Sequence, residues 1–478
     1  MLGKKISKLM GITLLIAVLL AACAPAATAT PAAKPPATNP PEATSAATEA
    51  PTEAPAATQA ATEAPTSATK PSGKVTIWMW KAAHDTLTNS GVLDKFAKEY
   101  PDVQVEVVEY APADVYQKLP LALQAGTGAP DISLVENSHL AQIVSLGGLT
   151  DMTQWVTPYI DKMNAYKWED AKLDDKYYAM PWDSGPVVMY YRRDVFEAAG
   201  LPSDPDSVSK AVATWDDYFN VCKTIKEKTG SACFSNNKAN NYGRLYEMML
   251  WQQGLGYYND QGQVTVDSPE NVATLEMLKK FWDADLTSDQ LEWTDGWYAE
   301  LAADTTAKPI ATLVEAAWMG AFLKGWIAPG TEGKWGVALM PAMKEGEVRG
   351  ANDGGSAFVI PEQSQNKEAA WALTEFLFGR VDNQVAMFKS SDFFPSLEAA
   401  YADPVFSEPD PFFADQAVRP MYVDVVKEVP IAHVYGPYYP EMNGFVATAI
   451  QKVATGEMSP ADALKEAADA IRAQTGMP

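Results

Sequence analysis

Histidine and cysteine are scarce in this sequence, with three of each among 478 residues. The histidines, His84, His139 and His433, are isolated and lack the paired spacing of a zinc site. The loop Gly126-Thr-Gly128 lacks the third glycine of a dinucleotide-binding loop, because Ala-Pro-Asp follows it. No Gly-x-Ser-x-Gly motif or clear Ser/His/Asp arrangement is present. The sequence therefore offers no motif for a zinc enzyme, a nucleotide site or a serine hydrolase, and we expect no cofactor or metal.

Positive charge is also in short supply. The chain has 37 Lys and Arg residues against 61 Asp and Glu residues, for a net charge of −24 at pH 7. This balance repels nucleic acid, and no basic stripe along the chain offsets it. Aromatic residues are abundant instead, with 14 Trp and 20 Tyr. Packing seldom needs so many, and stacking on flat ligand faces is one use for the excess.

Long apolar runs are limited to one, the segment 12–20, which is too short to span a bilayer. Three lysines precede it: Lys4, Lys5 and Lys8. Together these features predict a secretory signal over residues 1–22. Its end, Leu20-Ala-Ala-Cys23, resembles the bacterial lipoprotein cleavage box, which implies cleavage before Cys23 and attachment of diacylglycerol to its sulfur. The alternative is an ordinary secreted protein with a chance cysteine.

Residues 23–73 contain almost only Ala, Thr, Pro, Ser and Glu, and they lack aromatics. Such a segment cannot bury enough apolar surface to offset the cost of ordering the backbone. We therefore predict a disordered tether between the lipid and the folded part. Further along, Cys222 and Cys233 are expected to form a disulfide because the protein is exported. Two reduced thiols are the alternative.

From residue 75 onward, strand patterns alternate with helix patterns. The first predicted strands are 75–80, 103–108 and 131–135, and the first predicted helices are 92–100, 116–125 and 140–146. Later strands are expected at 310–316, 335–341 and 356–361. Helices are expected after the cap residues Thr214, Ser268 and Ser459 and over 367–378. This rhythm predicts an α/β fold with mainly parallel sheets flanked by helices.

The stretch Tyr178–Asp194 combines chain-direction breakers with a strand and two ligand-binding residue types. Pro181 and Gly185-Pro186 surround Trp182 and Asp183, and the apolar run 187–191 follows. Proline and glycine allow the chain to change direction here, and the apolar run is long enough for a buried strand. We interpret the stretch as a hinge between two lobes that carries part of a binding site. An ordinary loop entering a buried strand is the alternative.

Five blocks together resemble the extracellular solute-binding protein family 1, the sugar-type receptors of ABC importers. The blocks are 96–105, 123–131, 190–202 with Thr214-Trp-Asp-Asp217, Asp353-Gly-Gly-Ser356, and 456–464. The resemblance implies a two-lobed periplasmic-binding-protein fold of type II, joined by hinge crossings, with the ligand between the lobes. By analogy the first lobe comprises 74–182 and 318–378, and the second 183–317 and 379–478. The resemblance also implies a membrane permease and an ATPase as partners, and we expect a monomer.

Ligands of open α/β sheets bind at the carboxyl ends of strands. We therefore expect ligand-binding residues directly after strands or at helix caps that face the cleft. They are Trp80, Lys81, Glu136, Asn137, Trp182, Asp183, Arg244 (with Asn241 and Tyr242), Trp318, Asp353, Gly354, Phe394, His433, Tyr435 and Tyr438. A sugar ring has polar edges for carboxylates and amides and flat C–H faces for indole rings. Core packing or surface pairing is the alternative role for Trp80, Lys81, Arg244 and the late Tyr and His residues. For Glu136, Asn137 and Asp353 the alternative is a loop residue whose hydrogen bonds are satisfied within the protein.

The predicted function is a lipid-anchored, extracytoplasmic receptor that binds a mono- or oligosaccharide, closes its lobes and delivers it to an importer. One alternative is the same fold with a different solute, such as a polyamine, a metal ion or a polyol phosphate. Another is a surface enzyme acting on glycosides, since distant carboxylates can form a catalytic pair.

Overall fold

The computed structural model describes residues 70–239 and 243–478. The predicted signal, the lipidated Cys23 and most of the predicted tether lie outside the described residues, as do Asn241 and Tyr242. Within the described residues, no helix is both long and apolar enough to cross a membrane.

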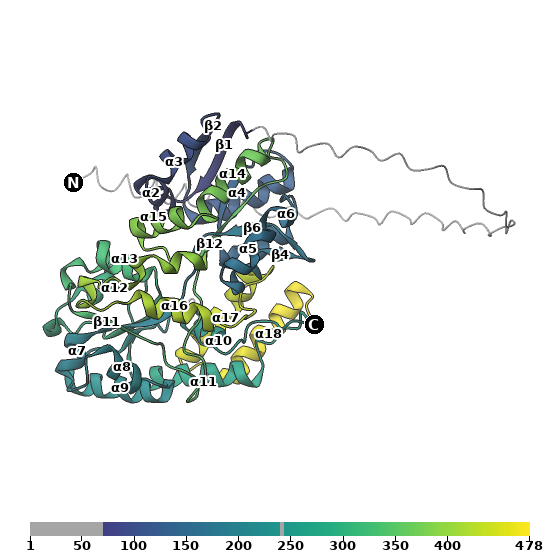
Figure 1. Ribbon diagram of the computed structural model, residues 1–478. Helices are drawn as coiled ribbons and strands as arrows, with labels where there is room; N and C mark the ends of the chain where they lie inside the picture. The colour runs from purple at the N-terminus through teal and green to yellow at the C-terminus, as the bar shows by residue number, and fades with distance from the viewer. Residues whose placement is uncertain (1–69, 240–242) are drawn as a thin grey trace, which may run out of the picture. The chain divides into compact units, whose positions relative to one another are not determined.

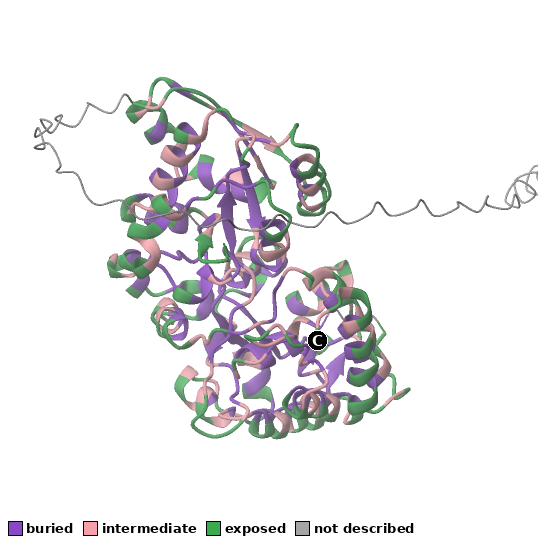
Figure 2. Ribbon diagram, turned by 90° about the vertical axis from the view of Figure 1, so that its right-hand side faces the viewer, coloured by how far each residue is buried: buried purple, intermediate pink, exposed green. Residues whose placement is uncertain are grey.

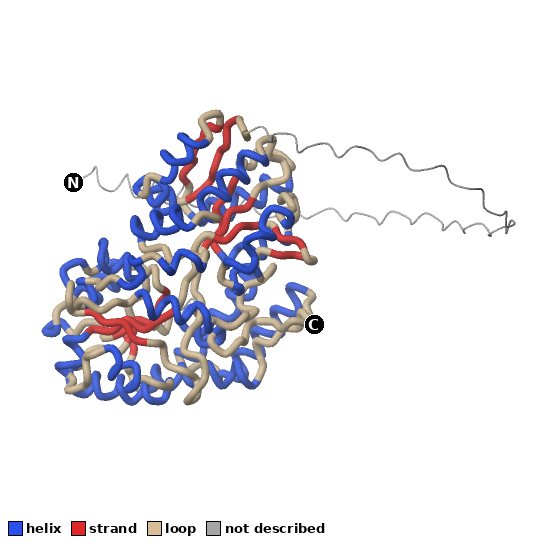
Figure 3. The backbone as a smooth tube through the Cα atoms, viewed as in Figure 1, coloured by secondary structure: helices blue, strands red, loops and turns tan. Residues whose placement is uncertain are grey.

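The first lobe is built on a five-stranded sheet with the order β2-β1-β3-β12-β6. The strands are β1 Gly73–Met79, β2 Val103–Glu109, β3 Ile132–Glu136, β6 Ala179–Pro181 and β12 Ser356–Val359. Strand β1 is parallel to β2 and β3, whereas β12 is antiparallel to β3 and β6. Alternate side chains of β1, those of Val75, Ile77 and Met79, are fully buried, as the period of two predicts. Figure 3 shows this sheet in red with helices around it.

Helices cover the faces of this sheet. They are α2 Lys81–Asn89, α3 Val92–Glu99, α4 Pro112–Ala125, α5 Asn137–Ser145, α14 Lys367–Phe378 and α15 Val381–Ser391. Helix α4 begins at Pro112, four residues before the predicted start at 116. Proline is well suited to the first turn of a helix, because the backbone N–H groups there have no partner within the helix and the N–H that proline lacks is not needed. Helix α15 packs against α14, α2 and α3, so it belongs to the first lobe. The predicted placement of residues from 379 onward in the second lobe is wrong for this helix.

The second lobe contains a three-stranded sheet in the order β10-β7-β11. The strands are β7 Val187–Arg192, β10 Thr312–Ala316 and β11 Trp335–Ala338, and both pairings are antiparallel. The prediction of mainly parallel sheets is therefore wrong for this sheet, and in the first lobe it holds only for β1, β2 and β3. All six residues of the central strand β7 are buried, as expected for its continuous apolar run. The expectation that 318–378 belongs to the first lobe is wrong for β11. An apolar strand of four residues does not reveal in its sequence which sheet it joins.

Ten helices surround or follow this sheet within the described residues. They are α7 Arg193–Ala198, α8 Pro205–Ala211, α9 Trp215–Thr229, α10 Arg244–Trp251, α11 Pro269–Asp283, α12 Asp295–Ala302, α13 Met319–Phe322, α16 Arg419–Glu428, α17 Tyr439–Ala454 and α18 Pro460–Thr475. Thr214 and Asp217 form the predicted capping box at the start of α9. Figure 2 shows the central strands as buried and the outer faces of the helices as exposed, whereas the edge strand β2 is mostly intermediate or exposed.

Short elements complete the fold. They are α6 Thr153–Val156, β4 Lys172–Leu173, β5 Lys176–Tyr177, β8 Phe234–Ser235, β9 Thr287–Ser288, the π-helix η4 Leu323–Ile327, and 3-10 turns at Thr157–Lys162, Ala165–Trp168, Thr305–Ala307, Pro329–Thr331, Glu398–Ala402, Pro404–Ser407 and Pro411–Phe413.

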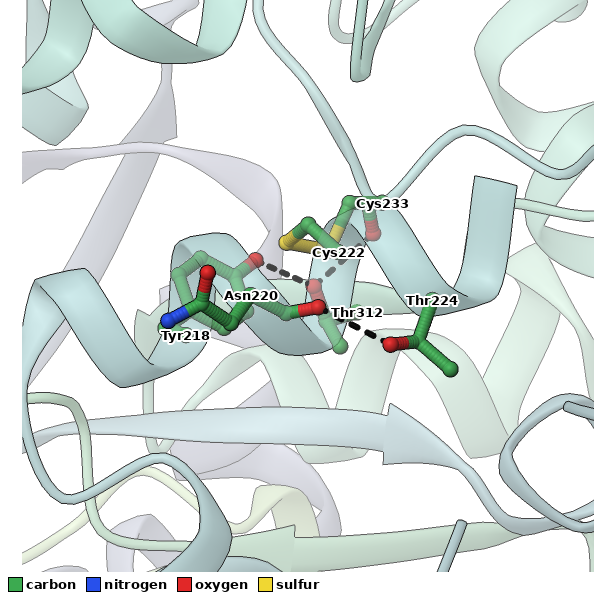
Figure 4. The surroundings of a disulfide bond; sticks show 6 residues. All are labelled: Tyr218, Asn220, Cys222, Thr224, Cys233 and Thr312. Atoms are coloured by element: carbon green, nitrogen blue, oxygen red, sulfur yellow. Dashed lines mark hydrogen bonds between the residues drawn. A yellow bond between two sulfur atoms is a disulfide. The ribbon is translucent and has the colours of Figure 1, made fainter. Parts of the chain in front are cut away.

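A disulfide joins Cys222 of α9 to Cys233, which directly precedes β8. Thr312 of β10 donates a hydrogen bond to the Cys233 carbonyl at 2.8 Å and is hydrogen-bonded to the Tyr218 hydroxyl at 2.6 Å (Figure 4). The bridge therefore ties helix α9 to the edge of the second sheet.

The chain crosses between the lobes along the predicted hinge stretch. Asp183 pairs with Pro395 and Pro186 with Asn352 in isolated β-bridges. A side chain at Gly185 would overlap the backbone of Asp353, so the two crossings can lie this close only because residue 185 is glycine.

Candidate functional site

A cleft of about 620 Å³ opens between the lobes at these crossings. Nine of the predicted ligand-binding residues line it: Trp80, Glu136, Trp182, Asp183, Arg244, Trp318, Asp353, Gly354 and Tyr435. Residues that the sequence did not single out line it as well, including Tyr116, Ser138, Glu247, Trp293, Phe322, Phe393 and Tyr439. Pockets of this size, largely apolar with a few convergent polar groups, are the usual form of a small-molecule site.

The first-lobe wall carries two carboxylates. Glu136 ends β3 and caps α5, where its side chain accepts a hydrogen bond from the Ser138 N–H at 3.3 Å and another from the Ser138 hydroxyl. Asp183 follows β6, is only 6% exposed, and accepts a hydrogen bond from the Ser356 N–H at 2.8 Å. Burial raises the pKa of Asp183 to about 6, although the charge of Lys167 opposes this shift.

A buried polar group supports this wall from behind. The ammonium of Lys167 donates to the Asn137 side-chain oxygen and to the Gly354 carbonyl at 3.4 Å. The Asn137 amide in turn donates to Asp170 at 2.9 Å. Burial lowers the pKa of Lys167 to about 8, against the charges of Asp183 and Asp170. Gly355, with φ of +87°, leaves the room that Lys167 needs beside Asp183.

The second-lobe wall is organised by Arg244, the first residue of α10. Its guanidinium donates to both oxygens of Glu315, at 3.0 and 2.8 Å, and to Asp353. Glu292 lies 3.5 Å away, and the rings of Trp293 and Trp318 lie within 5.8 Å of the guanidinium carbon. Burial alone would lower the pKa of Arg244, but the charges of Asp353, Glu315 and Glu292 raise it well above its usual value.

A third group of polar side chains surrounds Glu247, which is 6% exposed on α10. Its carboxylate accepts hydrogen bonds from the Tyr257 hydroxyl at 2.6 Å, the Asn443 amide at 2.8 Å and the Tyr439 hydroxyl at 3.1 Å. Burial raises the pKa of Glu247 to about 7, although these hydrogen bonds lower it.

Aromatic rings form most of the remaining surface of the cleft. Trp318 donates its indole N–H to the Asp353 carbonyl at 3.1 Å, and its ring packs 5.9 Å from Trp293 and 5.5 Å from Phe322. Trp182 is 1% exposed and stacks on Phe378, so it supports the wall with little open ring face. The arrangement combines flat apolar faces with hydrogen-bond acceptors of both lobes.

Four predicted ligand-binding residues are not brought to the cleft. Lys81 lies at the surface, paired with Asp85 at 2.6 Å. Asn137 is 1% exposed and occupied between Lys167 and Asp170. Phe394 is fully buried in the second lobe's core, and Tyr438 is 42% exposed outside the cleft. In both aromatic cases the neighbour, Phe393 or Tyr439, lines the cleft instead.

His433, the remaining candidate, does not line the cleft and is hydrogen-bonded to Asp260 at 2.6 Å. No group of three or more His, Cys, Asp or Glu side chains that could hold a metal ion occurs among residues 70–239 and 243–478.

Comparison with known proteins gives a consistent result. Residues 91–414 match the family described as bacterial extracellular solute-binding protein. The chain is 27% identical to the lactose-binding protein of Rhizobium radiobacter, over 80% of this chain and 89% of that protein. It is also 27% identical to the arabinooligosaccharide-binding protein of Halalkalibacterium halodurans, over 84% and 89%.

The fold is similar to that of a protein whose crystal structure is described as an extracellular solute-binding protein of family 1. The TM-score is 0.71 at 25% identity, covering 83% of this chain and 98% of that one. This similarity confirms the predicted two-lobed α/β binding-protein fold.

Proposed function

Because this chain belongs to the bacterial extracellular solute-binding proteins, as its sequence blocks predicted, we propose that it is the carbohydrate receptor of an ABC importer. It binds a neutral mono- or oligosaccharide between its lobes, closes, and presents the sugar to a membrane permease. The observation that carries the proposal is the interlobe cleft, which is lined by both indole rings and carboxylates.

The chemistry of the cleft supports a polyhydroxylated ligand. Glu136 and Asp183 offer charged acceptors for hydroxyl groups, and hydrogen bonds to charged groups contribute about 1.5–3 kcal/mol each. The rings of Trp293 and Trp318 cover apolar C–H faces, as aromatic residues do at many sugar-sized sites. Two relatives are named as binding proteins for lactose and for arabino-oligosaccharides, which agrees with this class of ligand.

Binding and transport require a hinge motion and no bond cleavage. A ligand that contacts both walls binds the closed state better than the open one and shifts the population toward closure. We expect the backbone to bend near the interlobe crossings, where Asp183 pairs with Pro395 and Pro186 with Asn352. We therefore propose a binding protein without enzymatic activity, held at the outer face of the membrane by a lipid on Cys23.

Calorimetric titration of the chain without residues 1–22 tests the function. We expect saturable binding of at least one sugar among lactose and arabino-, galacto- and malto-oligosaccharides, and none of spermidine or divalent cations. Binding of spermidine or a metal ion alone would overturn the proposal.

Thin-layer chromatography after incubation should show every sugar intact, and cleavage products would contradict the absence of enzymatic activity. Palmitate labelling that is lost in Cys23→Ser tests the anchor.

A further inference from the structure

A row of aromatic side chains continues from the cleft to the outer surface of the second lobe. Trp318 and Phe322 line the cleft, whereas Trp326 lies outside it and is 52% exposed. The ring centroids of Trp318 and Phe322 are 5.5 Å apart, and those of Phe322 and Trp326 are 5.9 Å apart. The Tyr298 ring lies 5.0 Å from Trp326. We call Trp318, Phe322, Trp326 and Tyr298 the aromatic strip.

The local helix geometry keeps these rings in one row. Trp318 and Trp326 are eight residues apart in the sequence. Because a regular α-helix turns about 100° per residue, it would place these two side chains about 80° apart around the helix axis. The chain instead passes from α13 into the π-helix η4, whose wider turn reduces this rotation. Single π turns are rare and are found often at functional sites.

Two separate helical segments contribute rings to the aromatic strip. Helix α12, which carries Tyr298, packs against η4 on the second lobe, where Figure 1 labels α12 beside α13.

Burial in the core does not account for Trp326. Its neighbours Leu323 and Ile327 are buried in the core of the second lobe, but Trp326 is not among the residues of that core. An indole that is half exposed and continuous with the wall of a ligand cleft is the usual form of a contact surface.

Resting on the function proposed above, we propose that Trp326 and Tyr298 form an additional sugar subsite outside the cleft. It is occupied only by oligosaccharides whose chains extend beyond the cleft along Phe322. The strip therefore sets the preferred chain length of the ligand, while the cleft sets the sugar type.

Titration of arabino-, galacto- and malto-oligosaccharides, from the disaccharide to the pentasaccharide, tests the subsite. In Trp326→Ala we expect the ratio of pentasaccharide affinity to disaccharide affinity to fall about fivefold. Trp326→Tyr keeps a flat ring and should keep most of the ratio. Trp155→Ala is the matched control, because Trp155 is another partly exposed indole stacked on a second tryptophan, Trp371, and does not line the cleft.

An unchanged ratio in Trp326→Ala, or an equal loss for all chain lengths, would overturn the subsite while leaving the carbohydrate receptor intact. Failure of the unaltered chain to bind any saccharide would overturn both proposals, so the two failures are distinguishable. Thermal unfolding of each variant, which should match that of the unaltered chain, excludes a loss of binding through misfolding.

Discussion

The two walls of the cleft stabilise buried charge in different ways. On the second lobe, Arg244 contacts the carboxylates of Glu315 and Asp353 directly. On the first lobe, Lys167 makes its hydrogen bonds to the neutral oxygens of Asn137 and Gly354, not to a carboxylate. The pKa of Arg244 is raised well above its usual value, whereas that of Lys167 is lowered to about 8.

This difference follows from the two side chains. A guanidinium is charged at any physiological pH and presents several donors in one plane, so it can hold several carboxylates at once. A buried ammonium is a compact charge that loses its proton readily when desolvated. The cation of the second-lobe wall therefore keeps its charge, whereas the cation behind the first-lobe wall can lose its proton as the pH rises. Glu247 extends the comparison, since it is buried among neutral donors alone.

The largest effect is expected for Arg244→Met. The change leaves the buried Glu315 and the partly buried Asp353 without their cation. Removing one partner of a buried ion pair costs about 3–5 kcal/mol of the free energy of unfolding, and the partial exposure of Arg244 places the expected loss near the lower end. The matched control is Arg472→Met, which removes a surface pair with Asp267 and should cost less than about 1 kcal/mol. Equal losses in urea denaturation would show that the Arg244 cluster is no different from a surface pair.

Glu247→Gln should change how stability depends on pH. The pKa of Glu247 is raised from 4.5 to about 7, so the folded state binds this proton more tightly than the unfolded state does. The resulting contribution to the free energy of unfolding is fully present below pH 4.5 and is lost as the pH rises through 7. Between these values the free energy of unfolding of the unaltered chain should fall by about 2–3 kcal/mol relative to Glu247→Gln. Urea denaturation across this range measures it, with the exposed Glu428→Gln as control. Parallel curves for Glu247→Gln and the unaltered chain would contradict the assignment.

Lys167→Met should cost less than Arg244→Met, about 1–2 kcal/mol. The substitution leaves the Asn137 oxygen without this donor, but it strips no carboxylate of a directly bonded cation. The comparison uses the same urea denaturation, with the exposed Lys81→Met as control. A loss as large as that in Arg244→Met would remove the contrast between the walls.

Asp183→Ala and Trp318→Ala should each weaken sugar binding at least tenfold, the equivalent of about 1.4 kcal/mol. The first removes an acceptor from the first-lobe wall, and the second removes a ring face from the second-lobe wall. Both are checked by calorimetric titration with the sugar that binds the unaltered chain best. Unchanged affinities in the two variants, each with normal thermal unfolding, would count against the cleft as the binding site.

The one-residue errors at Phe394 and Tyr438 show where prediction from sequence fails. Neighbouring side chains point to opposite sides of an extended segment and are about 100° apart on a helix. Phe393 and Phe394 lie beside the bridge residue Pro395, and Tyr439 begins α17. The sequence located the loops but not the direction of each ring. Glu247 was missed for another reason, since a carboxylate inside a helix carries no signal of being buried.

Local sequence determined the elements and the hinge of this protein. Alternation, caps and breakers act within a few residues, so they specified β1, the box at Thr214 and the crossing at Gly185 without help from distant parts. Tertiary structure alone decided that β11 joins β7, and that Arg244, Glu315 and Asp353 meet at one wall. Those contacts join residues far apart in the chain, and the interaction energies that select them exist only once both lobes are folded.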